Sequence, residues 1–161
     1  MCLVALLAAL PAWGALAGES FETRLSPSPL TDGTRINITG EGRAAASLDG
    51  RKLTVSGSFQ GLASPATTAE LYAGAGIAIP GPKAFDLTVT PATSGTIAAS
   101  LTLTAKQAAA LRAGHFYVQI NSRGAPDGNL TGWLLPPHPF AGEDVPVAGG
   151  GFLPQLDVSQ K

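Results

Sequence analysis

The chain has 161 residues, enough for one domain, and ten basic against eleven acidic residues give it a net charge of −1 at pH 7. This balance gives no electrostatic reason to expect nucleic acid, whose binding needs a basic surface, so we expect no nucleic-acid partner. The hydrophobic content of 45% argues against disorder, while 20 glycines and 13 prolines favour a turn-rich β protein over a helical bundle.

Residues 1–17 have the pattern of a signal peptide. Residues 2–17 carry no charge, and a proline and a glycine interrupt an apolar run that is too short to span a bilayer comfortably. Ala15-Leu16-Ala17 has the small-x-small form of a cleavage site, although no Lys or Arg precedes the run. The alternative is a buried N-terminal helix. The signal-peptide interpretation predicts a secreted or periplasmic protein with no transmembrane segment after cleavage.

Cysteine occurs once, at Cys2 inside this segment, so the mature chain would contain none. Disulfides, thiolate catalysis and Cys-ligated metals are then excluded from the mature protein. We expect the domain, residues 18–135, to be held together by its hydrophobic core, for which it is long enough.

Alternating apolar and polar residues predict strands from the start of this domain. Residues 21–25 form the first predicted strand, and Ile36 and Ile38 alternate with polar neighbours. Asp49-Gly50 is a preferred pair for a two-residue type I′ turn and predicts a hairpin. In its second arm Leu53, Val55 and Phe59 share one face, while Lys52, Thr54, Ser56 and Ser58 share the other.

The same alternation continues to residue 134. Its apolar positions are Leu71, then Phe85, Leu87 and Val89, then Ile97, Ala99, Leu101 and Leu103, then Phe116, Val118 and Ile120, and finally Leu130 and Leu134. A period of two means that one face of each strand packs inward and the other meets water. Several such strands separated by Gly and Pro turns predict an antiparallel sandwich or barrel.

One short helix interrupts the strands. Thr104 can cap it, and Gln107 three residues later completes a capping box. Residues 105–113 are strong helix formers, and Gly114 suits the position after the last turn. We expect this helix to cross from one sheet to the other.

After residue 135 the composition changes. Prolines and three consecutive glycines predict neither strand nor helix for residues 136–151. The apolar residues between Phe152 and Val158 can dock back on the domain or reach a partner. We interpret residues 136–161 as a loosely held C-terminal tail.

Residues 53–89 and 94–134 resemble a bacterial CHRD (chordin) domain, and FETRLSPSP at 21–29 resembles the start of that family. The most specific part is the helix together with a series of residues after it, namely Gly114, Tyr117-Val118, Pro126, Gly128 and Gly132-x-Leu134. The resemblance implies a β-sandwich of immunoglobulin-like or Cu,Zn superoxide dismutase-like Greek-key type, usually extracellular. In animal chordins such domains accompany modules that bind growth factors of the transforming growth factor class.

The chain departs from that family at polar positions. The family commonly has His-x-His where this chain has Glu70-Leu71-Tyr72, Val-His-Thr where it has Ile120-Asn121-Ser122, and Glu-Ile-Arg-Gly where it has Asn129-Leu130-Thr131-Gly132. The resemblance therefore carries over the fold, whereas a role that depends on the family histidines does not carry over.

Five outward positions form a candidate surface patch. The period of two directs these side chains away from the core; they are Glu70, Tyr72, Tyr117, Asn121 and Trp133. We hypothesise that they lie on adjacent strands. One carboxylate, two phenols and an amide are too poor a donor set for a tight transition-metal site, so we expect no metal and no cofactor. The alternative is an ordinary solvated sheet face.

No catalytic constellation is predicted. His115 and His138 are the only histidines, and no Ser-His-Asp or paired-carboxylate spacing is present. The sequence therefore predicts a non-enzymatic, exported binding or structural module whose partner is an unknown protein or polysaccharide of the cell envelope. One alternative is a metal-binding or superoxide dismutase-like protein with a degenerate site, and another is a tail that tethers the domain.

Overall fold

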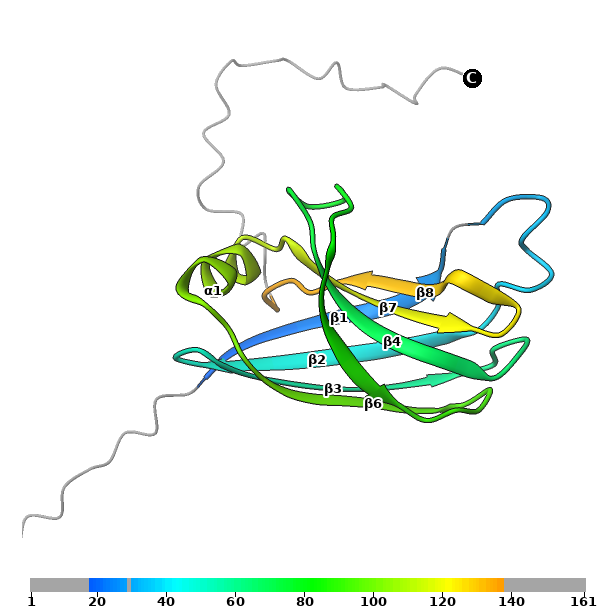
Figure 1. Ribbon diagram of the computed structural model, residues 1–161, viewed down its shortest axis with the longest axis horizontal. Coiled ribbons are helices and arrows are strands. Elements are labelled where there is room, and N and C mark those ends of the chain that lie inside the picture. The colour runs from blue at the N-terminus through cyan, green and yellow to red at the C-terminus, as the bar shows by residue number, and fades with distance from the viewer. Residues whose placement is uncertain (1–17, 29, 138–161) are drawn as a thin grey trace, which may run out of the picture.

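The computed structural model describes residues 18–28 and 30–137, and within them eight antiparallel strands and one helix form a closed barrel (Figure 1). The elements are β1 (Glu19–Pro27), β2 (Glu41–Asp49), β3 (Lys52–Gln60), β4 (Ala66–Ala73), β5 (Lys83–Val89), β6 (Gly95–Thr102), α1 (Ala105–Arg112), β7 (Phe116–Ser122) and β8 (Ala125–Trp133). The predicted signal peptide and residues 138–161 of the predicted tail lie outside the described residues.

Around the barrel the strands follow the order β1-β2-β3-β6-β5-β4-β7-β8, and β8 pairs with β1. Strands β4, β5 and β6 are neighbours in sequence and in space, and β7 returns to lie beside β4. This arrangement is a Greek key. It places β4, β7 and β8 side by side, and these are the strands that carry the predicted patch.

The predicted sandwich is wrong in one respect, because the two sheets join into a single barrel. Alternation shows that each strand has a buried face, but it does not show whether the buried faces belong to two packed sheets or to one closed sheet. Two short ladders close the ring, Ser26-Pro27 against Leu130-Thr131 and Thr88-Val89 against Ile97-Ala98.

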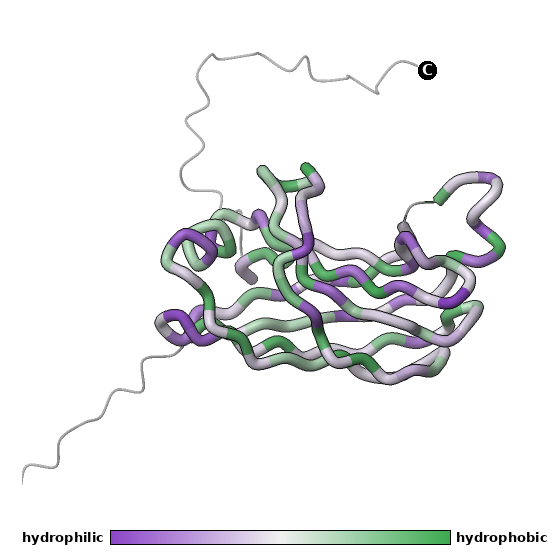
Figure 2. The backbone as a smooth tube through the Cα atoms, viewed as in Figure 1, coloured by the Kyte–Doolittle hydropathy of each residue, from purple (hydrophilic) through white to green (hydrophobic). Residues whose placement is uncertain are grey.

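The barrel interior is filled by the apolar positions that the alternation predicts. Leu53, Val118 and Leu134 are each 0% exposed and belong to one core cluster. Phe85 and Leu101 pack against this cluster but are only partly buried. Burial of one such side chain stabilises the fold by about 1.5–3 kcal/mol, and the described residues contain no disulfide to add to it. Figure 2 shows the alternation along the strands as a change of hydropathy.

The β2–β3 hairpin turns one residue later than predicted. Asp49 pairs with Lys52, so the two turn residues are Gly50 and Arg51. Gly50 has φ +58 at the first central position, but Arg51 at the second does not have a positive φ. A type I′ turn needs a positive φ at both positions, so the predicted type I′ turn is wrong and the turn is of type II′. The two faces of the arm are nevertheless as predicted, because the pairing register keeps Leu53 and Val55 inside.

The strand predicted around Ile36 and Ile38 is absent, and residues 32–37 form turns instead. The amides of Thr34 and Arg35 donate to the Thr31 carbonyl, at 3.2 and 3.0 Å. Ile36 is 77% exposed whereas Ile38 is buried. Local turn hydrogen bonds around Asp32-Gly33 therefore outweigh a two-residue alternation.

Helix α1 begins and ends as the sequence predicts. Thr104 accepts a hydrogen bond from the Gln107 amide at 3.2 Å, and the Gln107 side chain accepts one from the Thr104 amide at 2.9 Å, which completes the capping box. Gly114 follows with φ +73, a conformation that favours glycine.

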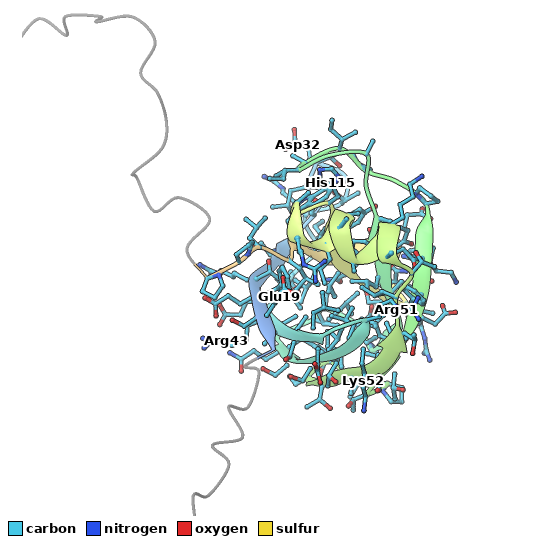
Figure 3. All side chains as sticks on the ribbon, turned by 90° about the vertical axis from the view of Figure 1, so that its left-hand side faces the viewer. Glu19, Asp32, Arg43, Arg51, Lys52 and His115 are labelled. Atoms are coloured by element: carbon cyan, nitrogen blue, oxygen red, sulfur yellow. The ribbon has the colours of Figure 1, made fainter. Side chains whose placement is uncertain are left out.

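The helix lies across one end of the barrel, as the view in Figure 3 shows. Ala108 and Leu111 enter the core cluster. Arg112 donates to both carboxylate oxygens of Glu19, at 2.7 and 2.6 Å, which fastens the end of the helix to the start of β1. This bidentate contact lowers the pKa of Glu19, chiefly through the hydrogen bond.

Replacing Thr104 with alanine removes the acceptor for the Gln107 amide. We expect the free energy of unfolding to fall by about 1 kcal/mol, measured by chemical denaturation. Thr102→Ala changes a neighbouring exposed threonine that does not cap the helix, and it should stay within about 0.5 kcal/mol of the parent. Equal losses in the two variants would contradict the capping role.

Candidate functional site

The five predicted patch residues lie on three adjacent strands. Glu70 and Tyr72 come from β4, Tyr117 and Asn121 from β7, and Trp133 from β8. Tyr72 pairs with Tyr117 across β4 and β7, and Tyr117 pairs with Trp133 across β7 and β8. The structure therefore brings all five together on one outer face of the barrel.

Three of them form an aromatic row across the strands, defined as Tyr72, Tyr117 and Trp133. The rings of Tyr72 and Tyr117 are stacked, with centroids 5.0 Å apart and planes 10° apart. The rings of Tyr117 and Trp133 are tilted by 42° at 4.6 Å. Cross-strand aromatic pairs of this kind stabilise a sheet by about 0.5–1.5 kcal/mol beyond the area they bury.

The loop between β4 and β5 covers part of this row. The Tyr117 hydroxyl lies 3.4 Å from the Gly81 carbonyl, and a Cβ on Gly74 would stand 2.8 Å from the Trp133 ring. Tyr117 is consequently only 6% exposed, so the prediction that this position meets water is wrong. Trp133 is partly buried beside the loop.

The loop itself projects from the barrel (Figure 1), and Figure 2 shows hydrophobic positions near its tip. Ile77 and Ile79 are 53% and 55% exposed. The amide of Gly74 donates to the His115 carbonyl at 2.7 Å, which fastens the base of the loop to the residue before β7. The aromatic row thus positions a projecting apolar loop.

The carboxylate of Glu70 contacts three polar side chains. The Tyr72 hydroxyl donates to Oε2 at 2.5 Å, and Asn121 Nδ2 donates to the same oxygen at 3.4 Å. Lys83 Nζ lies 3.5 Å from Oε1 and 2.8 Å from Asp86. The Glu70 side chain is only 12% exposed, so its negative charge is largely removed from water. The contacts with Tyr72, Asn121 and Lys83 compensate for this loss of hydration.

Asn121 points outward but is buried by its neighbours on the same face. Its Nδ2 donates to Thr68 Oγ1 at 2.9 Å, and its Oδ1 accepts from Gln119 Nε2 at 2.8 Å. It is 7% exposed, so the predicted exposure is wrong here as well. Alternation gives the direction of a side chain, whereas the size of its neighbours decides whether water reaches it.

Tyr72 is the titratable group most affected by this arrangement. Burial, followed by its hydrogen bond to Glu70 and the charge of that residue, raises the pKa of Tyr72 to about 12. Each cause disfavours the phenolate, because a negative charge would be poorly solvated and would face another negative charge. Tyr72 is therefore a hydrogen-bond donor to Glu70 over the ordinary pH range.

The polar groups of this face are engaged with neighbouring side chains. Glu70 is already engaged, and the part of the chain in view contains no group of three or more His, Cys, Asp or Glu side chains that could hold a metal. Sequence reasoning missed Thr68, Lys83 and the covering loop. The sequence could not indicate these neighbours, because the pairing register of β4 and β5 shifts between Leu71 and Tyr72 and cannot be read from the alternation alone. His115 is partly buried, and His138 lies outside the described residues.

A groove of about 1250 Å³ lies elsewhere, over the outer face of β1, β2 and β3. Its lining includes Arg24, Glu41, Arg43 and Gln60, with Leu135 and Pro136 on one side. Sequence reasoning missed it. The small outward side chains of β2 and β3 could have indicated a groove, but only once it is known that these strands lie beside β1.

Charged groups in the groove are only partly paired. Glu41 accepts from Arg24 Nη2 at 3.4 Å and from Gln60 Nε2 at 3.1 Å. Arg43 forms no ion pair within residues 18–28 and 30–137. Its guanidinium can donate to an acceptor outside the domain.

Comparison with known proteins yields one match. A family model described as the CHRD domain matches residues 21–134, which is more than half of the chain. No curated protein matches. No solved structure matches either.

The raised pKa of Tyr72 can be measured directly. The chain has two tyrosines, so Tyr117→Phe leaves Tyr72 as the only phenol. Its ultraviolet absorbance should titrate with a midpoint well above 10.0, slightly below that of the parent because Tyr117 itself contributes to the raised pKa. Because the folded pKa lies above the ordinary value of 10.0, the contribution of Tyr72 to stability is complete below pH 10.0 and is lost as the pH rises toward about 12.

Glu70→Gln in the same background removes the facing charge and should lower that midpoint toward 10.0. Asp86→Asn removes the smallest contribution and should lower it less. A midpoint at 10.0 in folded Tyr117→Phe protein would refute the proposed contact between Tyr72 and Glu70.

Proposed function

Because the chain belongs to the CHRD domain family, we propose that it is an exported, non-enzymatic module that binds a protein or polysaccharide of the cell envelope or extracellular space. The family match supports a domain of extracellular type. The cleavage-site pattern at residues 15–17 supports export. Among the residues that the structure describes, none of the helical structure has the length and hydropathy of a membrane span.

The packing of the barrel interior supports a binding role on the exterior. Among the described residues, the buried polar or charged side chains are Asn121, Ser122 and Asn129. Ser122 donates to Asn129 at 2.9 Å, and Asn129 donates to the Thr39 carbonyl at 2.7 Å. Asn121 faces outward instead and bonds to Thr68 and Gln119. Among the described residues no buried side-chain nitrogen or oxygen lacks a partner, so the interior offers no unpaired polar side chain for a ligand.

The groove over β1, β2 and β3 is the observation that carries the proposal. It is concave, and its outward side chains donate and accept hydrogen bonds. Arg43 and Gln60 suit the hydroxyl and carboxylate groups of a polysaccharide, and equally the carbonyls and carboxylates of a protein. Its area lies on strands rather than on loops, so the contact surface is held rigidly.

Export predicts a defined mature N-terminus. When the whole chain is produced in a secreting host, N-terminal sequencing of the exported protein should give Gly18, because signal peptidase cleaves after the Ala15-Leu16-Ala17 pattern. Ala17→Arg places a large charged residue at the cleavage position and should leave the precursor uncleaved. Exported protein that still begins with Met1 would contradict the assignment.

The groove can be tested by direct binding. Binding of the purified protein is measured in two separate experiments, one with immobilised envelope polysaccharide and one with separated envelope proteins. We expect Arg43→Ala to weaken binding about five- to tenfold in the experiment that shows binding. Lys52→Ala changes an exposed cation on β3 that does not line the groove, and it should bind as the parent does. Binding that is equal in both variants would refute the role of the groove.

A further inference from the structure

The seam between β5 and β6 is paired at one end only. Strand β6 pairs with β3 along its whole length, from Gly95 to Thr102. On its other side it pairs with β5 at Ala98 and Ile97 alone, opposite Thr88 and Val89. Beyond these pairs the ribbon of β5 leaves β6 toward the projecting loop (Figure 1). Residues 84–87 of β5 and 99–102 of β6 therefore face each other without pairing, and we call this gap in the β5–β6 ladder the open seam.

Antiparallel alternation shows which backbone groups face the open seam. The amide of Thr90 donates to the Thr96 carbonyl at 3.0 Å, so Thr96 directs its backbone groups toward β5. Every second residue of β6 does the same, which includes Ser100 and Thr102. The groups of Ala99 and Leu101 face β3. Within the described part of the chain, Ser100 and Thr102 have no strand partner on the seam side.

Apolar side chains lie beneath the open seam. Leu101 and Phe85 point inward and pack against the core cluster, yet both are only partly buried. Leu53, which pairs with Leu101 from the closed side, is 0% exposed. The seam therefore leaves inward-facing apolar surface within reach of water.

The β6 edge carries none of the features by which proteins protect a free strand edge. Its outward side chains Ala98, Ser100 and Thr102 are exposed, small and uncharged, and it contains no proline. Natural edges are commonly blocked by charged residues, proline or bulges. On the β5 side, Lys83 and Asp86 are held against each other at 2.8 Å.

We propose that the open seam binds one extended polypeptide segment of a partner protein, which adds as a strand to the free edge of β6. The backbone of the segment exchanges hydrogen bonds with Ser100 and Thr102. Its alternate apolar side chains cover Leu101 and Phe85. This is strand addition to a sheet edge, in which the main chain supplies affinity and the alternating side chains supply specificity.

The shape of the seam distinguishes this occupant from others. Both edges of the seam belong to strands, so we infer that it suits one extended strand, whereas a folded second copy would meet β5. A polysaccharide lacks the regular alternation of N–H and C=O groups that Ser100 and Thr102 would pair with. The site is separate from the groove over β1, β2 and β3, so failure of one proposal leaves the other standing.

Amide hydrogen exchange of the unaltered mature protein tests the premise. We expect the amides of Ser100 and Thr102 to exchange at least about tenfold faster than those of Ala99 and Leu101, which bond to β3. Protection of Ser100 equal to that of Leu101 would overturn the proposal. It would mean that the seam is already filled, for example by residues 138–161 of the same chain.

A peptide of about twelve residues, selected from a random library against the mature protein, serves as the probe. On binding, it should slow exchange of Ser100 and Thr102 at least about tenfold. Ser100→Pro removes the N–H that faces the seam and leaves the β3 ladder intact, so it should weaken binding at least about tenfold. Ser100→Ala keeps the N–H and should bind as the parent does.

The exchange map decides the result if Ser100→Pro fails to fold, because it uses the unaltered protein. Selected peptides that protect residues of the groove instead of the seam would overturn the proposal. Equal binding by the proline and alanine variants would overturn it as well. Failure to select any binding peptide would also count against it.

Discussion

Backbone hydrogen bonding that closes the strands into a ring is the constraint on which this structure depends. The described residues contain no disulfide, so the ring and its apolar filling must hold the fold. Most neighbouring strands pair along much of their length, as β2 and β3 do. Closure itself depends on the short ladders at Ser26-Pro27 and at Thr88-Val89. Helix α1 adds to closure, since Leu111 enters the core from one end while Arg112 fastens the helix to β1.

The outer face of β4, β7 and β8 carries polar side chains that contact one another. Glu70, Tyr72 and Asn121 stand where the sequence resemblance implies histidine. In the structure Tyr72 and Asn121 each donate a hydrogen bond to Glu70. The polar groups at these positions therefore satisfy one another and support the loop between β4 and β5. The two binding surfaces that we propose lie instead where groups are left unpaired within the described residues, namely the groove at Arg43 and the open seam at Ser100.

Local patterns predicted local structure well. The alternation around Leu53 and Val55 identified a strand face, and Thr104 with Gln107 identified the start of the helix, because each depends on residues close in sequence. The sequence could not predict the closure of the sheet or the burial of Tyr117 and Asn121, which depend on side chains brought in by other strands. Residues 32–37 show the opposite failure, since turn hydrogen bonds at Thr31 outweighed an apparent alternation. The five patch residues do lie on adjacent strands, as the alternation predicted, but the predicted exposure of Tyr117 and Asn121 was wrong.

The open seam has a mechanical consequence. A shell that is joined along part of one line behaves like a material with a crack, in which an applied load concentrates at the crack tip. Here the tip is the pair Thr88 and Ala98, the last rung of the β5–β6 ladder before the strands diverge. Tension that separates the two halves of the barrel would break this rung first and then travel toward Val89, one rung at a time, while the long ladders on either side stay whole.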